Sequence, residues 1–347
     1  MKIIAKLLCG VALAAAVIAP ASAKDLNKVG ISVGLLGNPF FVATIKGIED
    51  AAKKINPNVQ VTSVSADYDL NKQVSQVDSF IAAGVDVIML NAVDAKAIAP
   101  AVKKAQAAGI VVAAFDVSAP GADVTVMTNN VKAGEEACQY LVDHTGGKGD
   151  YVILNGPASS SILERVKGCK DVLAKHPDIK VLSDDQNAEG SRDGGLKVFQ
   201  SLLTRFDKID AVFAINDPTA IGAQLAAKQL NRSEFIFTAV DGAPDIEKEL
   251  ASGTSMIKAS ASQDPYVMAG QSLTMAADLL AGKKPAEPTV LLDPKLITAD
   301  NLKDYKGWTD ARKTPKAWWA RYYRPHLFCL SNGLPNTDLD LGPLLLE

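Results

Sequence analysis

Amide, carboxylate and guanidinium side chains gather where the apolar runs of this sequence end. Asn91 and Asp116 follow two such runs in the first half, and Asp241 and Gln263 follow two in the second half. Amides and carboxylates offer fixed donors and acceptors that match vicinal hydroxyl groups, while an aromatic face covers the apolar C–H side of a sugar ring. The residues that stand at or just beyond the ends of the apolar runs are Gly37, Asn38, Pro39, Phe40, Phe41, Asn91, Asp94, Asp116, Asn155, Arg165, Asn216, Asp217, Asp241 and Gln263. These residue types predict reversible binding of a polyhydroxylated ligand.

Each Asn or Asp at a strand end has a second interpretation as the N-cap of the helix that follows. For any single residue, capping and ligand binding remain equally open. Because both halves of the chain present such residues together, a ligand cleft explains the set better than capping does. For the Phe40–Phe41 pair, we expect one ring to enter the core and the other to face the cleft.

The residues that several other chemistries need are missing. The sequence holds no G-x-x-x-x-G-K-[ST] motif, and no G-x-G-x-x-G follows the first apolar run. His144 precedes a Gly-rich turn and His176 adjoins a proline, so both are expected on the solvated surface. Asp184 and Asp185 point in different directions on an extended chain, which favours a solvated loop over a metal site. We therefore predict a protein that is not an enzyme and that carries no cofactor and no metal.

Short apolar runs alternate with segments of helical period from Val29 onward, and each strand–helix unit takes about 25–30 residues. Such continuous apolar strands are typical of parallel sheets that helices cover on both faces. The first series of predicted elements covers 29–36, 40–55, 58–66, 70–84, 85–91, 97–109 and 110–116. The second series covers 132–144, 151–156, 159–176, 179–185, 191–206, 209–216, 217–230, 235–241, 245–253, 255–262 and 265–282. Two such series predict an α/β fold of two doubly wound, Rossmann-like lobes.

Residues 1–23 have the layout of a secretory signal peptide. Lys2 and Lys6 form a positive start, an apolar run covers 7–19, and a small-x-small cleavage motif covers 21–23. A membrane anchor is the alternative, but the apolar run is shorter than the ~20 residues of a spanning helix. We predict cleavage before Lys24 and export to a bacterial periplasm.

Composition and charge narrow the class of protein further. The length of 347 residues suggests about two domains, and a hydrophobic content of 48% is enough to build full cores. Removing residues 1–23, with two lysines and no acid, lowers the net charge by two, from −3 to −5. That balance gives no bulk attraction to nucleic acid or to an anionic membrane.

Two cysteines lie in predicted helices that flank one short strand. Cys138 belongs to 132–144 and Cys169 to 159–176, so the two helices are placed to pack side by side. An oxidising compartment favours a disulfide between them, and two buried free thiols are the alternative. A zinc site is not expected, because no Cys-x-x-Cys pair is present.

Several segments, in this order and spacing after a signal peptide, make the chain resemble the ribose-type periplasmic solute-binding proteins that feed ABC importers. They are NPFF at 38–41, GVDVIMLNAVD at 84–94, NGPASSSILERVKG at 155–168, AVFAINDPTAIGA at 211–223 and AVDGAPD at 239–245. The resemblance covers roughly residues 27–310. It implies the class I fold of that family, with a three-crossing hinge between two lobes. It also implies that the lobes close on a monosaccharide or polyol in a cleft between them. The residues that would line this cleft form the candidate set: Asn38, Phe40, Phe41, Asn91, Asp116, Arg165, Asn216, Asp241 and Gln263.

The resemblance also suggests domain boundaries. The N-terminal lobe would comprise 24–128 and about 264–290, and the C-terminal lobe 129–263 and about 291–310. Residues 311–347 break the pattern, and we expect an atypical tail without a function. Gly34 stands where a ribose binder has a polar residue, Val117 where it has an Arg, and Gly190 and Val240 where it has aromatic residues. These departures favour another pentose, a larger sugar or a polyol over ribose.

Other functions remain as alternatives to transport. A sugar-processing enzyme on the same fold would need a general base with a nearby electrophile. A lactose-repressor-type regulator would need a DNA-binding segment where residues 1–23 stand. Presentation of the bound sugar to a chemoreceptor would coexist with delivery to a membrane permease. We expect a monomer.

Overall fold

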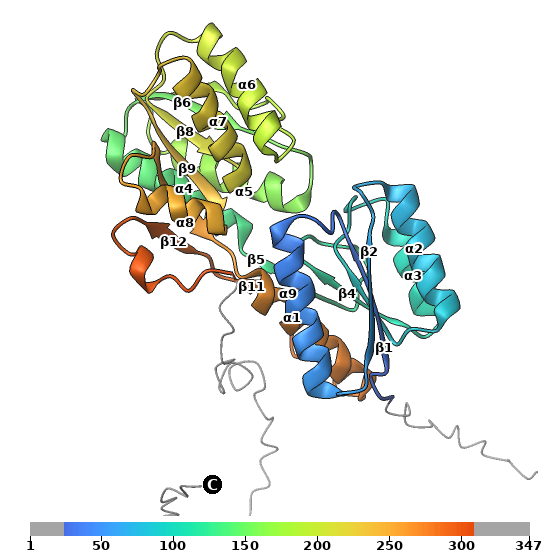
Figure 1. The fold of residues 1–347 in the computed structure, drawn as a ribbon. Helices are drawn as coiled ribbons and strands as arrows, with labels where there is room; N and C mark the ends of the chain where they lie inside the picture. Colours follow the sequence, from blue (N-terminus) through green and yellow to red (C-terminus); the bar gives the residue numbers. More distant parts are fainter. Residues whose placement is uncertain (1–23, 309–347) are drawn as a thin grey trace, which may run out of the picture. The chain divides into compact units, whose positions relative to one another are not determined.

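Two six-stranded sheets organise the part of the chain that the computed structural model describes, residues 24–308 (Figure 1). The predicted signal peptide at 1–23 and the predicted tail at 311–347 lie outside the described residues. Each sheet is covered by helices on both faces, so the predicted fold of two doubly wound α/β lobes is confirmed.

The first sheet is entirely parallel and has the order β11-β5-β4-β3-β1-β2. Its strands are β1 (Lys28–Val33), β2 (Gln60–Ser65), β3 (Val87–Leu90), β4 (Val111–Phe115), β5 (Val124–Thr128) and β11 (Thr289–Leu292). Its helices are α1 (Pro39–Ile55), α2 (Leu70–Ala83), α3 (Ala99–Ala107) and α9 (Pro265–Leu280). Helices α1 and α9 pack on one face, and α2 and α3 on the other.

The second sheet has the order β12-β10-β9-β8-β6-β7, with β12 antiparallel at one edge. Its strands are β6 (Gly149–Leu154), β7 (Ile179–Ser183), β8 (Ala211–Ala214), β9 (Ile236–Asp241), β10 (Ile257–Ser262) and β12 (Lys295–Thr298). Its helices are α4 (Asn130–Thr145), α5 (Ser160–Leu173), α6 (Arg192–Arg205), α7 (Asp217–Gln229) and α8 (Pro244–Ala251), and a 3-10 turn covers Leu302–Asp304. Helices α4 and α5 cover one face, and α6, α7 and α8 cover the other.

Local sequence explains where these elements begin and end. The central strands β3 and β8 are buried at every residue, as expected for parallel strands covered on both sides. Asp69 caps α2 by accepting a hydrogen bond from the Lys72 N–H, and Gly84 ends the helix in the left-handed conformation. The predicted element boundaries therefore lie within a few residues of those observed.

The chain passes between the two lobes three times. The crossings connect β5 to α4, β10 to α9, and β11 to β12. A hydrogen bond of 2.9 Å from Thr128 Oγ1 to Gln263 Oε1 joins the first two crossings. Lys132 on α4 pairs with Asp293 in the third crossing at 2.7 Å. Polar contacts thus tie the crossings to one another.

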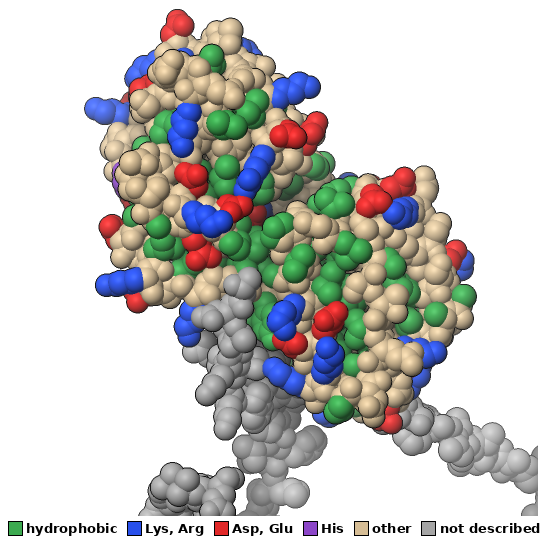
Figure 2. Space-filling model, viewed as in Figure 1, with side chains coloured by type: hydrophobic (Ala, Val, Ile, Leu, Met, Phe, Trp, Pro, Cys, Tyr) green, Lys and Arg blue, Asp and Glu red, His purple; other side chains and the backbone are tan. Residues whose placement is uncertain are grey.

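Charged side chains of both signs are interspersed over the face of the described residues that Figure 2 shows. Among residues 24–308, no helix combines the length and the apolar character that crossing a membrane requires.

Candidate functional site

Most of the predicted ligand residues lie at the carboxyl ends of the two sheets. Asn91 and Asp116 come directly after β3 and β4. Asp241 is the last residue of β9, and Gln263 comes directly after β10. Parallel α/β sheets bind ligands at this edge, where the strands point toward the helix N-termini.

In the first lobe, the buried Asn91 and the partly buried Asp116 form a polar pair. The Asn91 side-chain amide donates to Asp116 Oδ2 at 2.9 Å, and Gln73 Nε2 donates to the Asn91 carbonyl at 2.9 Å. Asp116 has a φ of +67°, and the Val117 N–H binds the Phe115 carbonyl at 2.8 Å across it, as in a γ-turn. Backbone strain of this kind concentrates at functional sites.

The environment of Asp116 raises the pKa of its carboxyl group. The pKa of Asp116 is raised to about 6, mainly by burial and to a smaller extent by the charge of Asp241. The Arg165 guanidinium and the Asn91 hydrogen bond oppose these effects. Such a group accepts hydrogen bonds from ligand hydroxyls when ionised, and those bonds are stronger than bonds between neutral groups.

Five residues of the second lobe and of its first two crossings form a closed ring of hydrogen bonds. Arg165 Nη1 and Gln263 Nε2 both donate to Asp241 Oδ1, at 3.3 and 2.6 Å. Arg165 Nε donates to Asn130 Oδ1 at 2.9 Å, and Asn130 Nδ2 donates to the Thr128 carbonyl at 3.0 Å. The Thr128–Gln263 bond closes the ring. Two ligand-type residues, Arg165 and Asp241, are therefore connected to the first two crossings.

Asp241 and Asp217 are two neighbouring buried acids in this lobe. Burial raises the pKa of both carboxyl groups, and the Asp241 charge raises that of Asp217 further. Asp217 is fully buried and accepts from Ser260 Oγ at 2.6 Å and from the Ala243 N–H at 2.7 Å. Its own backbone N–H supports Asp241. Asp217 therefore supports Asp241 from behind, and both depend on Arg165 for positive charge.

Asn38 and Asn216 are helix caps, as their second interpretation predicted. Asn38 Oδ1 accepts from the Phe40 N–H at 2.9 Å, and Asn216 Oδ1 accepts from the Thr219 N–H at 3.1 Å. The Asn216 amide nitrogen also donates to the Gly190 carbonyl at 2.9 Å. Both polar atoms of Asn216 are thus engaged within the protein.

The two phenylalanines differ from the expectation that one ring would face outward. Phe40 is 9% exposed and Phe41 4%, and both belong to the core under α1. Their rings meet edge to face at 5.5 Å, because each is the best available packing partner for the other. The pair packs the start of α1 into the core, and both rings are buried.

The sequence analysis missed two aromatic residues near this edge. Trp308 is buried, packs edge to face on Phe40 at 5.6 Å, and donates from Nε1 to the Asp241 carbonyl at 3.1 Å. Tyr68 lies in the loop after β2, beside Asn38 and Asp116. The other residues were found because they stand at the ends of apolar runs. Neither Trp308 nor Tyr68 stands directly at the end of such a run, so neither was predicted.

The predicted disulfide between Cys138 and Cys169 is confirmed, and it fastens α4 to α5 with Cα atoms 5.1 Å apart. The two helices also approach closely at Gly134, where a Cβ atom would stand 2.0 Å from the Arg165 carbonyl oxygen. Both contacts fix the helix that carries Arg165 against the helix that carries Asn130. The disulfide therefore helps to hold the guanidinium in place.

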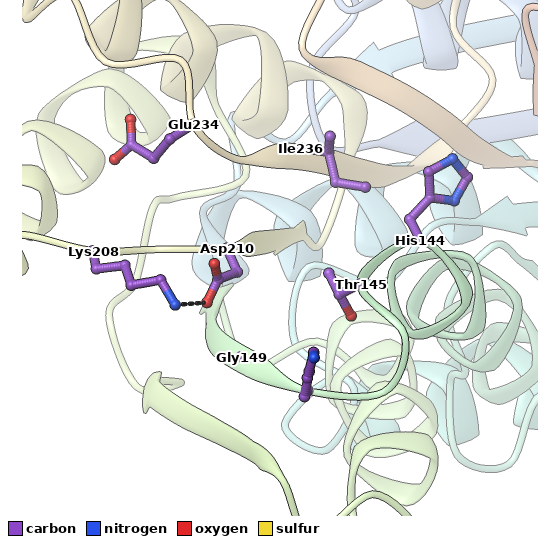
Figure 3. A pocket seen from close by; sticks show the side chains of 8 residues that line it. His144, Thr145, Gly149, Lys208, Asp210, Glu234 and Ile236 are labelled. Carbon is purple, nitrogen blue, oxygen red and sulfur yellow. Dashed lines mark ion pairs between the residues drawn. The ribbon is translucent and has the colours of Figure 1, made fainter.

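One cavity, of about 520 Å³, lies at the opposite edge of the second sheet, at the amino ends of β6, β8 and β9. Figure 3 shows its Lys208–Asp210 ion pair beside Gly149. No predicted ligand residue lines this cavity. Within residues 24–308, no group of three or more His, Cys, Asp or Glu side chains is arranged to hold a metal ion.

Comparison with known proteins agrees with this geometry. The family model described as the periplasmic binding protein domain matches residues 29–284. The chain belongs to this family of periplasmic binding proteins. Among them it groups with the ribose-type proteins, since the ribose import binding protein RbsB of Bacillus subtilis is 35% identical over 273 residues, covering 78% of this chain and 87% of that protein.

Other relatives carry different ligand names. The xylitol-binding protein of Mycolicibacterium smegmatis is 33% identical over 286 residues, covering 81% of this chain and 80% of that protein. The structure of the Caulobacter myo-inositol binding protein bound to myo-inositol matches with a TM-score of 0.74 at 28% identity, covering 83% of this chain and 98% of that one. These relatives are solute-binding proteins and not enzymes, as the sequence analysis predicted for this chain.

Proposed function

We propose that this protein binds a monosaccharide or polyol between its two lobes and delivers it to an ABC importer. The single observation that carries the proposal is the ring of hydrogen bonds that joins Arg165 and Asp241 to the first two crossings. A ligand bound by these two side chains would contact residues that are hydrogen-bonded to the segments about which the lobes would turn. The names of the relatives, which bind ribose, xylitol or myo-inositol, support the same class of ligand.

The binding step follows from the placement of the acids. A ligand hydroxyl that donates to Asp241 in one lobe leaves other hydroxyls to donate to Asp116 in the other lobe. A conformation in which both lobes contact the ligand gains interactions that a one-lobe complex lacks. The ligand therefore shifts the population toward that conformation, and the protein closes about its hinge. The ligand leaves chemically unchanged.

The cellular setting is part of the proposal. The family is periplasmic, and the layout of residues 1–23 supports export with cleavage before Lys24. The mature protein would act as a monomer and would dock on the membrane permease of the importer. Presentation of the bound sugar to a chemoreceptor is compatible with the same conformational change.

The proposal is tested by calorimetry and thermal shift on the mature protein from Lys24 onward. The panel contains pentoses, hexoses, polyols and inositols, and the protein is first unfolded and refolded to remove retained ligand. We expect one group of compounds to raise the melting temperature, because a ligand that binds only the folded state stabilises it. Arg165→Ala and Asp241→Ala should abolish that rise. A protein that binds no compound in the panel would contradict the proposal.

A further inference from the structure

The loop after β2 places an aromatic ring beside the first-lobe ligand residues. Asp67 and Tyr68 are consecutive non-glycine residues with φ values of +51° and +56°. This left-handed conformation is tolerated by Asp but is unfavourable for a bulky residue such as Tyr. Local bonds maintain it: the Tyr68 N–H binds the Gly34 carbonyl at 3.2 Å, and Ser65 Oγ donates to Asp67 at 2.6 Å.

The Tyr68 ring occupies space that only a glycine at position 34 leaves free. A Cβ atom on Gly34 would stand 2.5 Å from Tyr68 Cε1, well inside van der Waals contact. Gly34 does not have a positive φ, so space and not backbone conformation requires glycine there. Gly34 and Tyr68 therefore form a matched pair, in which the missing side chain of one makes room for the ring of the other.

The hydroxyl end of Tyr68 reaches the ligand residues while the rest of the side chain stays accessible. Burial raises the pKa of this hydroxyl, the Asp116 charge raises it further, and a hydrogen bond with Asn38 opposes them. Tyr68 is nevertheless 60% exposed. An aromatic side chain with its polar end fixed and its face uncovered is suited to contact a ligand that is polar on one side and apolar on the other.

The candidate set offers no comparable surface, because Phe40 and Phe41 are buried. At the two positions where a ribose binder has aromatic residues, Gly190 has no side chain and Val240 is fully buried in the second-lobe core. The polar groups of Asn38, Asn91 and Asp116 meet hydroxyls but leave the C–H face of a sugar uncovered.

We propose that Tyr68 is a ligand-contacting residue that selects ring-shaped sugars and cyclitols over open-chain polyols, by covering their C–H face. The inference rests on the proposed function and deepens it. A six-membered ring holds the axial C–H groups of each face parallel to one another, so one face of the ring can lie flat against an aromatic surface. A flexible open-chain polyol has to be ordered first, and ordering it costs conformational entropy.

The test compares D-xylose and myo-inositol with xylitol by calorimetry, using the wild type, Tyr68→Phe, Tyr68→Leu and Gly34→Ala. We expect the wild type to bind at least one cyclic compound more tightly than xylitol. Tyr68→Phe keeps the aromatic face and should stay within about threefold of the wild type for that compound. Tyr68→Leu keeps bulk without the face and should lose at least ~10-fold, equivalent to about 1.4 kcal/mol. Gly34→Ala displaces the ring and should lose a similar factor.

A second measurement separates contact from structural support. Protons of the bound cyclic ligand should shift upfield in NMR spectra of the wild type and of Tyr68→Phe, and this shift should disappear in Tyr68→Leu. Tyr140→Ala, which removes a half-buried tyrosine from α4, serves as the control and should bind normally. Unchanged binding by Tyr68→Leu, an equal loss for xylitol and the cyclic compounds, or a preference of the wild type for xylitol would overturn this inference alone. A wild type that binds none of the three compounds would also overturn this inference, whereas only a protein that binds no compound of the wider panel would overturn the proposed function.

Discussion

Asp116→Asn should make the empty protein more stable at neutral pH and should lower its affinity for the ligand. Burial raises the pKa of Asp116 from its ordinary value of 3.8 to about 6. The ionised carboxylate is therefore unfavourable in the folded state, and asparagine removes that charge without changing the size of the side chain. Asparagine also tolerates the φ of +67° at this position, and its carbonyl oxygen still accepts the hydrogen bond from Asn91.

The size and direction of the effect follow from the two pKa values. Between pH 3.8 and about 6 the unfolded chain has lost the Asp116 proton and the folded protein retains it, so stability falls as the pH rises. A shift of about two units at about 1.4 kcal/mol each gives a cost of about 3 kcal/mol above pH 6. Asp116→Asn should therefore raise the free energy of unfolding by up to about 3 kcal/mol at pH 7.5 and leave it nearly unchanged at pH 3.5.

Urea unfolding of the ligand-free mature protein at several pH values measures this difference. Asp178→Asn makes the same chemical change at an exposed turn and is the matched control. Calorimetry at pH 7.5 should show at least a 10-fold loss of sugar affinity for Asp116→Asn, since the ligand loses a charged acceptor. A destabilised Asp116→Asn protein at pH 7.5, or a gain that does not depend on pH, would refute the reasoning.

Three further changes test the second lobe. Asn130→Ala removes the acceptor of Arg165 Nε and leaves a buried donor unsatisfied, so urea unfolding should report a loss of ~1–3 kcal/mol; an unchanged free energy of unfolding would show that Arg165 is held without it. Replacing Cys138 and Cys169 together by Ala opens a crosslink with a sequence separation of 31, and urea unfolding should report a loss of about 3–4 kcal/mol. Equal stability of the oxidised wild type and the double variant would contradict this. Asn216→Ala removes the cap acceptor and should cost ~1 kcal/mol in urea unfolding; an unchanged free energy of unfolding would count against the capping role.

The lobes were predictable from the sequence because their central strands are buried on both faces. Strands such as β3 and β8 become continuous apolar runs, and the helices between them have clear start and stop residues. The edge strands β11 and β12 were not predicted as strands. Each has four residues and a mixed burial pattern, and each pairs with a strand far away in the chain. Nothing local marks such a strand.

The candidate site was predictable only where a ligand residue ends a strand. Asp116 and Asp241 follow that rule, and their positive φ values appear only in the folded backbone. Tyr68 follows β2, whose alternating exposure makes it a weak signal, and its importance depends on the absent side chain at Gly34. Asn216 illustrates an ambiguity of the same rule, because capping and ligand binding use the same residue type at the same place. A sequence shows which side chains are available, whereas the hydrogen bonds already formed within the protein decide which of them remain for a ligand.

The residues that carry unfavourable buried charge in the empty protein are the same residues that we propose to bind the ligand. Asp116, Asp217 and Asp241 are carboxylates whose pKa burial raises, and Arg165 is the cation that acts on all three. A fold selected for stability alone would place amides or apolar groups there, since incompletely compensated buried charge is unfavourable. Ligand hydroxyls can donate to these oxygens and stabilise their ionised form, an interaction that the empty protein lacks. The complex thus gains favourable interactions that the empty site does not have. This difference in free energy shifts a binding protein toward its liganded state.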